Sequence, residues 1–155
     1  WQSAVKLFHE IRSSDCVPSR KVYREVISLC AKTGQWRISA AILKDLIESV
    51  PQTSSADFSP NYDFLWNIVA GSMARAERWV EVIQFINEGI NMKVCFDQRT
   101  MTSAMYACSI NKQWQKILEL ENIREKLALV ITKEMSGFVI EACKELNDSE
   151  LEDNF

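Results

Sequence analysis

Four tryptophans each begin a stretch in which apolar residues recur at the spacing of an amphipathic helix. The tryptophans are Trp1, Trp36, Trp79 and Trp114. The residues three, four, six and seven positions after each tryptophan are apolar in all but two cases, Ser39 and Glu121. Residues at this spacing share one face of an α-helix. The pattern therefore predicts four amphipathic helices, each starting at its tryptophan.

A second series of apolar stripes alternates with the first. It comprises Tyr23, Val26, Ile27 and Cys30; Trp66, Val69, Ala70 and Met73; Met101, Ala104, Met105 and Cys108; and finally Val139, Ile140 and Cys143. We call these predicted helices A, and those that begin at a tryptophan B. The chain then contains one B helix, three A–B pairs and a final A helix. All stripe residues, including the three cysteines, are expected to be buried.

The stripes repeat every 35 residues, with one longer interval. Successive tryptophans are 35, 43 and 35 residues apart, and Cys143 follows Cys108 by 35. A helix pair of this size cannot bury its apolar face alone, so successive pairs must stack. We therefore predict an all-α fold, an α-solenoid of stacked antiparallel helix-turn-helix repeats.

The period divides the chain into a repeat domain over residues 1–147 and a short tail. The divisions are a half repeat at 1–19, repeats at 20–62, 63–97 and 98–132, and a partial repeat at 133–147. The surplus of the longer interval falls in VPQTSSADFSP, which predicts a loop insertion at 50–60. Residues 148–155 contain four carboxylates and no cation, which predicts a solvated acidic tail.

Residues suited to helix ends stand at the predicted boundaries. Ser19, Asp97 and Thr132 each directly precede an A helix and can accept hydrogen bonds from first-turn amides. Gly34 stands at the turn from A to B, where a left-handed residue ends a helix.

Composition agrees with a soluble helical protein and offers little for catalysis. Apolar residues make up 47% of the chain, the net charge is −3, and the 4 Gly and 3 Pro favour long helices. The five cysteines form no CxxC pair and His9 is the single histidine, so we expect reduced thiols, no metal and no cofactor. Because His9 lacks an orienting partner and no glycine-rich loop is present, we expect no enzymatic activity and no small-molecule substrate.

Three features are typical of a known repeat family: the 35-residue period, the aromatic residue of helix A, and the segment CVPSRKVYREVISLCAKTGQW. With them, the chain resembles the pentatricopeptide repeat family over nearly its whole length. The tetratricopeptide repeat has a period of about 34 residues and a tryptophan in its first helix. Here the repeated tryptophan opens the second helix, which favours the pentatricopeptide repeat. The resemblance implies a right-handed solenoid in a mitochondrion or plastid, with any targeting segment upstream of Trp1, that binds single-stranded RNA.

In this family, bases are read by the residue after the helix A aromatic together with the residue that closes the repeat. The resemblance therefore assigns Asn67 with Asp97, a pair associated with uracil. It also assigns Arg24 with Tyr62 or Asn61, and Thr102 with Thr132, neither of which is a usual base-reading pair. A purely structural interpretation of the first pair is also open, in which Asp97 caps the next helix and Asn67 is a surface residue.

Positive charge gathers on the first complete A helix. This helix contains one carboxylate, Glu25, and four cations, Arg20, Lys21, Arg24 and Lys32, which could contact an RNA backbone or a protein partner.

Two candidate functions follow from the resemblance and the charge pattern. The first is an RNA-binding module that acts in RNA processing, stabilisation, translation or ribosome assembly. The second is a protein-binding scaffold within a mitoribosome or membrane complex, without membrane insertion. The tryptophans are expected to pack between helices rather than stack on bases.

Overall fold

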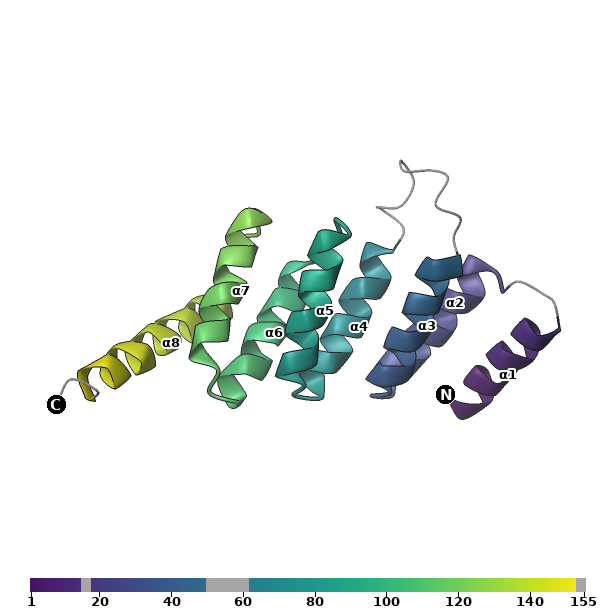
Figure 1. The fold of residues 1–155 in the computed structure, drawn as a ribbon, viewed down its shortest axis with the longest axis horizontal. Helices are drawn as coiled ribbons and strands as arrows, with labels where there is room; N and C mark the ends of the chain where they lie inside the picture. Colours follow the sequence, from purple (N-terminus) through teal and green to yellow (C-terminus); the bar gives the residue numbers. More distant parts are fainter. Residues whose placement is uncertain (15–17, 50–61, 153–155) are drawn as a thin grey trace.

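A computed structural model describes residues 1–14, 18–49 and 62–152, which form eight α-helices and no strand. Figure 1 shows the helices as a two-layered row, with the chain running from one end to the other. The A layer contains α2 (Arg20–Lys32), α4 (Asp63–Arg75), α6 (Gln98–Ile110) and α8 (Lys133–Glu152). The B layer contains α1 (Gln2–Ser13), α3 (Trp36–Ser49), α5 (Trp79–Asn91) and α7 (Trp114–Lys126). The all-helical prediction is confirmed.

Helix boundaries follow local signals that were visible in the sequence. Trp36, Trp79 and Trp114 are the first residues of their helices, as predicted, and Trp1 directly precedes α1. The A helices begin at the first residues of the predicted repeats. The predicted insertion at 50–60 lies outside the described residues. Helix α8 continues to Glu152, past residue 147, where the acidic tail was expected to begin.

The predicted caps form. The side chain of Ser19 accepts a hydrogen bond from the Val22 amide at 3.4 Å, Asp97 from Thr100 at 2.7 Å, and Thr132 from Met135 at 3.1 Å. These bonds satisfy first-turn amides that have no partner inside the helix. Gly34 has a φ of 76°, so the predicted left-handed turn is also confirmed.

The two layers pack differently. Each A helix contacts the next one, in the order α2, α4, α6 and α8. Each of α3, α5 and α7 packs on two successive A helices. The described B helices pack on A helices rather than on each other, although the Arg12–Asp45 ion pair links α1 to α3. The A helices therefore form a continuous sheet of helices, and the B helices fill the furrows between them. Side chains on the outer face of the A layer are consequently close enough to build a shared surface.

The core runs the length of the row between the layers. Trp66 packs against Phe85 and Phe96, with ring centroids 4.3 and 6.4 Å apart. The helix-opening tryptophans Trp36, Trp79 and Trp114 are half-buried and pack against this core, which agrees with a packing role.

The predicted stripe of the last helix is wrong. In α8 the fully buried residues are Met135 and Ala142, whereas Ile140 is 56% exposed and Cys143 is also exposed. The reason is that α8 packs on α6 and α7 with one face and has no described helix on the other. Cys95 is exposed too, so of the described cysteines only Cys30 and Cys108 are buried as expected.

Candidate nucleic-acid interface

A groove crosses the outer face of three successive A helices. Its cavity of about 290 Å³ is lined mainly by α4 and by the start of α6, and the end of α2 contributes Lys32. The lining residues are Lys32, Phe64, Asn67, Ile68, Gly71, Arg75, Asp97, Arg99, Thr100 and Ser103. The groove thus brings together two of the residues predicted to read a base and one predicted to bind the RNA backbone.

The cations of this groove have no acidic partners. Lys32, Arg75 and Arg99 are exposed, and none of them forms an ion pair with any carboxylate of the described chain. The Arg75 guanidinium folds back over Gly71, where it would lie 3.5 Å from an added Cβ atom. The lining contains these three cations and one carboxylate, that of Asp97, so the groove carries a net positive charge that can attract an anion.

Several cations of the B layer are instead neutralised within the protein. Arg12 pairs with Asp45 at 2.7 Å, and Lys116 pairs with Glu119 at 2.7 Å. Arg78 bonds to Glu81, which holds the pKa of that carboxyl below its usual value. These three cations therefore differ from Lys32, Arg75 and Arg99, for which no ion pair forms within the described residues.

An exposed aromatic side chain, Phe64, lies among these cations. Phe64 is 56% exposed, and the guanidinium carbon of Arg24 lies 5.8 Å from its ring centroid. Phe64 was not among the predicted site residues, because it lies outside the apolar stripe that contains Trp66. The available signal was its place as the second residue of helix A, off that stripe.

Asn67 and Asp97 lie together, but most of their hydrogen-bonding groups are used inside the protein. The Asn67 Nδ2 donates to the backbone oxygens of Asp63 at 2.8 Å and Cys95 at 3.0 Å. The Asn67 Oδ1 accepts from the Asp97 amide at 2.9 Å, and Asp97 Oδ1 accepts from the Thr100 amide. Asn67 therefore clamps the segment that leads into α6. Asp97 Oδ2 accepts no hydrogen bond within the described residues.

The remaining predicted base-reading residues are placed less favourably. The Thr102 hydroxyl donates to the Gln98 carbonyl at 2.8 Å, and the Thr132 hydroxyl caps α8. No hydrogen bond joins these two threonines in the part of the chain that is described. Arg24 is exposed, but Tyr62 is buried, and Asn61 lies outside the described residues. Arg20 and Lys21 are exposed on the first turn of α2 and do not line the groove.

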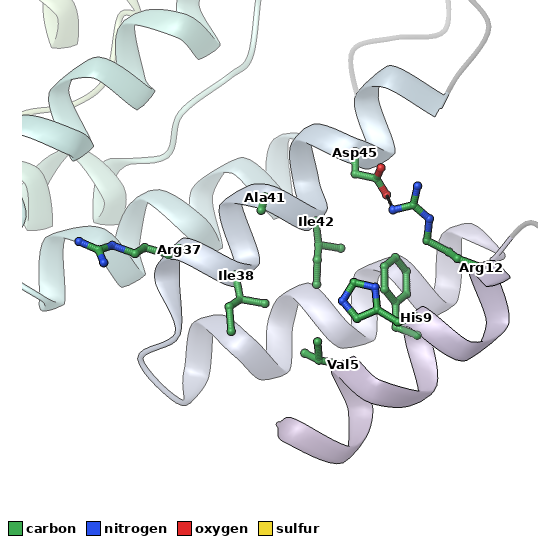
Figure 2. A pocket seen from close by; sticks show the side chains of 9 residues that line it. Val5, His9, Arg12, Arg37, Ile38, Ala41, Ile42 and Asp45 are labelled. Carbon is green, nitrogen blue, oxygen red and sulfur yellow. Dashed lines mark hydrogen bonds and ion pairs between the residues drawn. The ribbon is translucent and has the colours of Figure 1, made fainter.

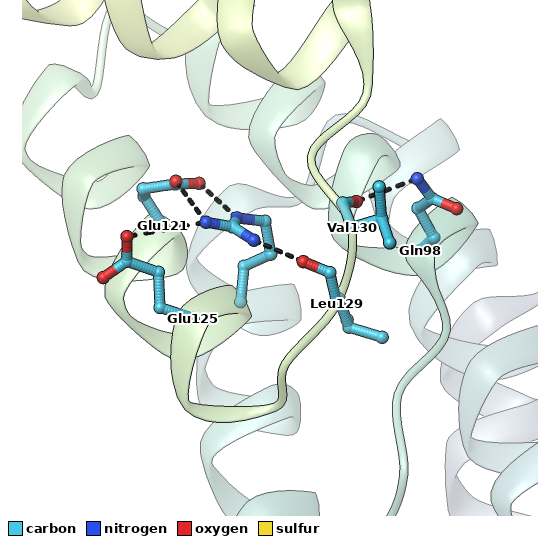
Figure 3. A network of polar contacts seen from close by, with 6 residues as sticks. Gln98, Glu121, Glu125, Leu129 and Val130 are labelled. Carbon is cyan, nitrogen blue, oxygen red and sulfur yellow. Dashed lines mark hydrogen bonds and ion pairs between the residues drawn. The ribbon is translucent and has the colours of Figure 1, made fainter.

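The segment that leads into α8 is clamped in a related way (Figure 3). The Gln98 Nε2 donates to the Val130 carbonyl at 2.9 Å. Arg124 donates to the Leu129 carbonyl and is held by Glu121 through bonds of 2.8 and 2.9 Å. In two successive repeats, a polar residue of the A helix thus holds the linker that ends its repeat: Asn67 of α4 in one and Gln98 of α6 in the next.

A larger cavity of about 470 Å³ separates α1 from α3 (Figure 2). The Arg12–Asp45 ion pair bridges the two helices at its edge, and the Tyr23 hydroxyl donates to Asp45 at 3.2 Å. His9 lines the cavity, whose lining contains no serine or cysteine nucleophile. A third, more apolar cavity of about 310 Å³ lies between α3 and α5.

Within residues 1–14, 18–49 and 62–152, no group of three His, Cys, Asp or Glu side chains is arranged to hold a metal ion. None of the described helices is long and apolar enough to span a membrane.

No protein-family model matches the chain, and no curated protein sequence matches it. Function is therefore inferred from the groove and from the repeat pattern.

Proposed function

We propose that this chain is a pentatricopeptide-type repeat protein that binds single-stranded RNA along the outer face of its A helices. The observation that carries the proposal is the groove in which Lys32, Arg75 and Arg99, which form no ion pair within the described residues, line the same cavity as the exposed ring of Phe64. The 35-residue spacing and the right-handed solenoid of that family are part of this proposal. So is an organellar setting, in a mitochondrion or plastid, with a role in RNA processing, stabilisation, translation or ribosome assembly.

Each part of the groove has a defined task in this proposal. The three cations neutralise phosphates, which supplies most of the affinity and makes it depend on salt. Phe64 offers a face on which a base can stack, worth about 1–3 kcal/mol. A duplex keeps its bases stacked on each other, so this contact favours single-stranded RNA.

Base selectivity is assigned to Asp97 rather than to the full Asn67–Asp97 pair. The Asn67 amide is occupied by three backbone groups, so its task is to hold Asp97 in place. The open Oδ2 of Asp97 can accept a hydrogen bond from an imino or amino group on the Watson–Crick edge of a base. Uracil offers an N3–H group to such an acceptor.

The test is the salt dependence of binding to a short, fluorescently labelled single-stranded RNA. A variant with Lys32→Gln, Arg75→Gln and Arg99→Gln should bind more weakly, and its slope of log affinity against log salt should fall by about 2, at about 0.7 per lost phosphate contact. The matched control removes three exposed lysines outside the groove, Lys44→Gln, Lys126→Gln and Lys144→Gln. Equal slopes for the two triple variants would refute a groove-specific RNA site.

One observation favours the second candidate function, a protein-binding scaffold of an organellar complex. Beyond Arg99 the A layer loses its basic character, because α8 exposes Glu134 and Glu141 and α6 exposes Tyr106 and Ile110. Exposed aromatic and aliphatic side chains beside carboxylates suit a protein partner better than a phosphate backbone. Nuclease treatment of the native complex discriminates between the two: release of the protein supports RNA binding, and retention supports the scaffold.

A further inference from the structure

An apolar cleft opens on the B layer between α3 and α5, in the middle of the row. Both helices pack on α4, which lies between them (Figure 1). The cleft has a volume of about 310 Å³, which is within the range of ligand-binding pockets. Trp66 of α4 lines it together with residues of both B helices. We call it the α3–α5 cleft.

The α3–α5 cleft has an aromatic floor and an apolar mouth. Trp66 and Phe85 are 3 and 9% exposed, and their ring centroids lie 4.3 Å apart. Ala40 and Ile47 of α3 are half-buried, and Met92, which follows α5, is exposed. Ala40 and Ile47 lie two helical turns apart on one face of α3. Because Ala40 is small, an approaching helix can place a larger apolar side chain above the floor.

Two carboxylates, one from each helix, border the α3–α5 cleft. Glu48 of α3 and Glu88 of α5 are exposed, and neither forms an ion pair within the described residues. Lys44 also lines the cleft and pairs with neither of them. The lining therefore has a net negative charge, opposite to that of the groove on the A layer.

The positions of these carboxylates favour a cation supplied from outside. Glu48 lies in the last turn of α3 and Glu88 in the last turn of α5, and neither turn contains a basic residue. The C-terminal end of a helix is the negative end of its dipole, so a carboxylate there is destabilised and a cation is stabilised. Helices α2 and α4 end instead with Lys32 and Arg75 in the last turn.

We propose that the α3–α5 cleft binds a basic amphipathic helix of a partner protein. One apolar side chain of that helix packs over Trp66 and Phe85, and its lysine or arginine side chains pair with Glu48 and Glu88. Helices that bind in a groove carry such apolar anchors on one face. The charge of the cleft disfavours a phosphate backbone or an acidic peptide at the same place. The proposal is independent of RNA binding, because no residue lines both the cleft and the groove.

The experiment measures fluorescence polarisation of a labelled leucine–lysine peptide, patterned as an amphipathic helix, on titration with the full chain. The peptide should bind the unmodified chain, and a leucine–glutamate peptide of the same pattern should bind at least about tenfold more weakly. Ala40→Leu fills the cleft and should weaken binding by about 10–100-fold, because the apolar anchor of the peptide is no longer buried. Glu48→Gln with Glu88→Gln should weaken binding by about 3–10-fold and lower its salt dependence.

The controls make the same substitutions outside the cleft. Ala4→Leu changes a half-buried alanine of α1, and Glu134→Gln with Glu145→Gln removes two exposed carboxylates of α8. Both controls should bind the peptide like the unmodified chain. Affinity for labelled single-stranded RNA should not change in any of these variants, so the outcome is separate from that of the RNA proposal.

Three results would overturn the proposal. The first is that the leucine–lysine peptide does not bind the unmodified chain, or binds it no better than the leucine–glutamate peptide does. The second is that Ala40→Leu binds as tightly as the unmodified chain; circular dichroism establishes that this variant is folded, and Met92→Gln at the mouth of the cleft replaces it if its melting temperature falls. The third is a dimer in light scattering that Ala40→Leu returns to 17.8 kDa, which would assign the cleft to a second copy of the chain.

Discussion

Gly89 provides a test of how tightly the middle of the row is packed. It lies in α5 and is buried against the aromatic cluster of Trp66 and Phe96. A Cβ atom added at Gly89 would lie 2.5 Å from Cζ and 2.8 Å from Cε2 of Phe96, and 3.2 Å from Cε3 of Trp66. Gly89→Ala therefore forces a ring to move, and both rings are themselves almost completely buried.

Two opposing effects decide the outcome of Gly89→Ala. Alanine is a better helix former than glycine by about 0.8–1.0 kcal/mol, which stabilises α5. Overpacking a filled core costs about 1–3 kcal/mol, and the upper part of this range applies because the closest atoms belong to an enclosed ring. We expect a net loss of about 1–2 kcal/mol in the free energy of unfolding. This corresponds to a fall in melting temperature of about 2–8 °C.

The matched control is Gly137→Ala in α8, because a Cβ atom at Gly137 would meet nothing within 4 Å. Only the helix-propensity gain applies there, so this variant should be more stable than the unmodified chain by about 0.5–1 kcal/mol. Urea titrations followed by circular dichroism measure both differences. The packing argument is refuted if Gly89→Ala is as stable as Gly137→Ala.

Three further changes have expected outcomes. Asn67→Ala removes two bonds that clamp the linker before α6 and one bond within α4, and should cost about 1–3 kcal/mol of unfolding free energy. Thr102→Ala, which loses one bond within its own helix, should cost clearly less, and equal urea midpoints would contradict the clamp. Glu77→Gly places glycine where φ is 56° and should raise the unfolding free energy by about 1 kcal/mol, so an unchanged midpoint would exclude strain at that turn. Burial raises the pKa of the Cys108 thiol to about 12, above its value of about 8.5 in an unfolded chain, so its contribution to stability is present below about pH 8.5 and is lost as the pH rises toward 12. The difference in unfolding free energy between the unmodified chain and Cys108→Ala should therefore narrow with rising pH, whereas a constant difference would show that this thiol does not titrate as inferred.

The sequence predicted the position of every A and B helix because the signals for them are local. A tryptophan marks the start of each B helix, and a capping side chain precedes three of the four A helices, α2, α6 and α8. The packing of Ile140 and Cys143 could not be predicted in this way. Periodicity reports the place of a residue within a repeat, but not whether a neighbouring helix is present to cover it.

The candidate site was predicted only in part, for a different physical reason. The structure shows the Asp97 cap of the purely structural interpretation, whereas Asn67, expected there as a surface residue, is half-buried and bonds to the Asp97 amide. Base reading by the two residues stays a prediction. The bonds that join Asn67 to the Cys95 carbonyl and to the Asp97 amide depend on the path of the linker, which no local pattern encodes. Phe64 was not predicted because a single apolar residue outside the stripe gives no local signal that cations of neighbouring helices surround it.

The linker clamps also bear on how the row responds to force. Asn67 and Gln98 each hold a linker segment that ends their own repeat, so these bonds join residues within one repeat and none spans the whole chain. Tension applied at the two termini is then carried through each clamp in series. Under tension the repeats should unfold one at a time, so the chain should lengthen in discrete steps of one repeat. When the tension is released, a repeat can refold and reform its clamp in contact with its neighbours alone.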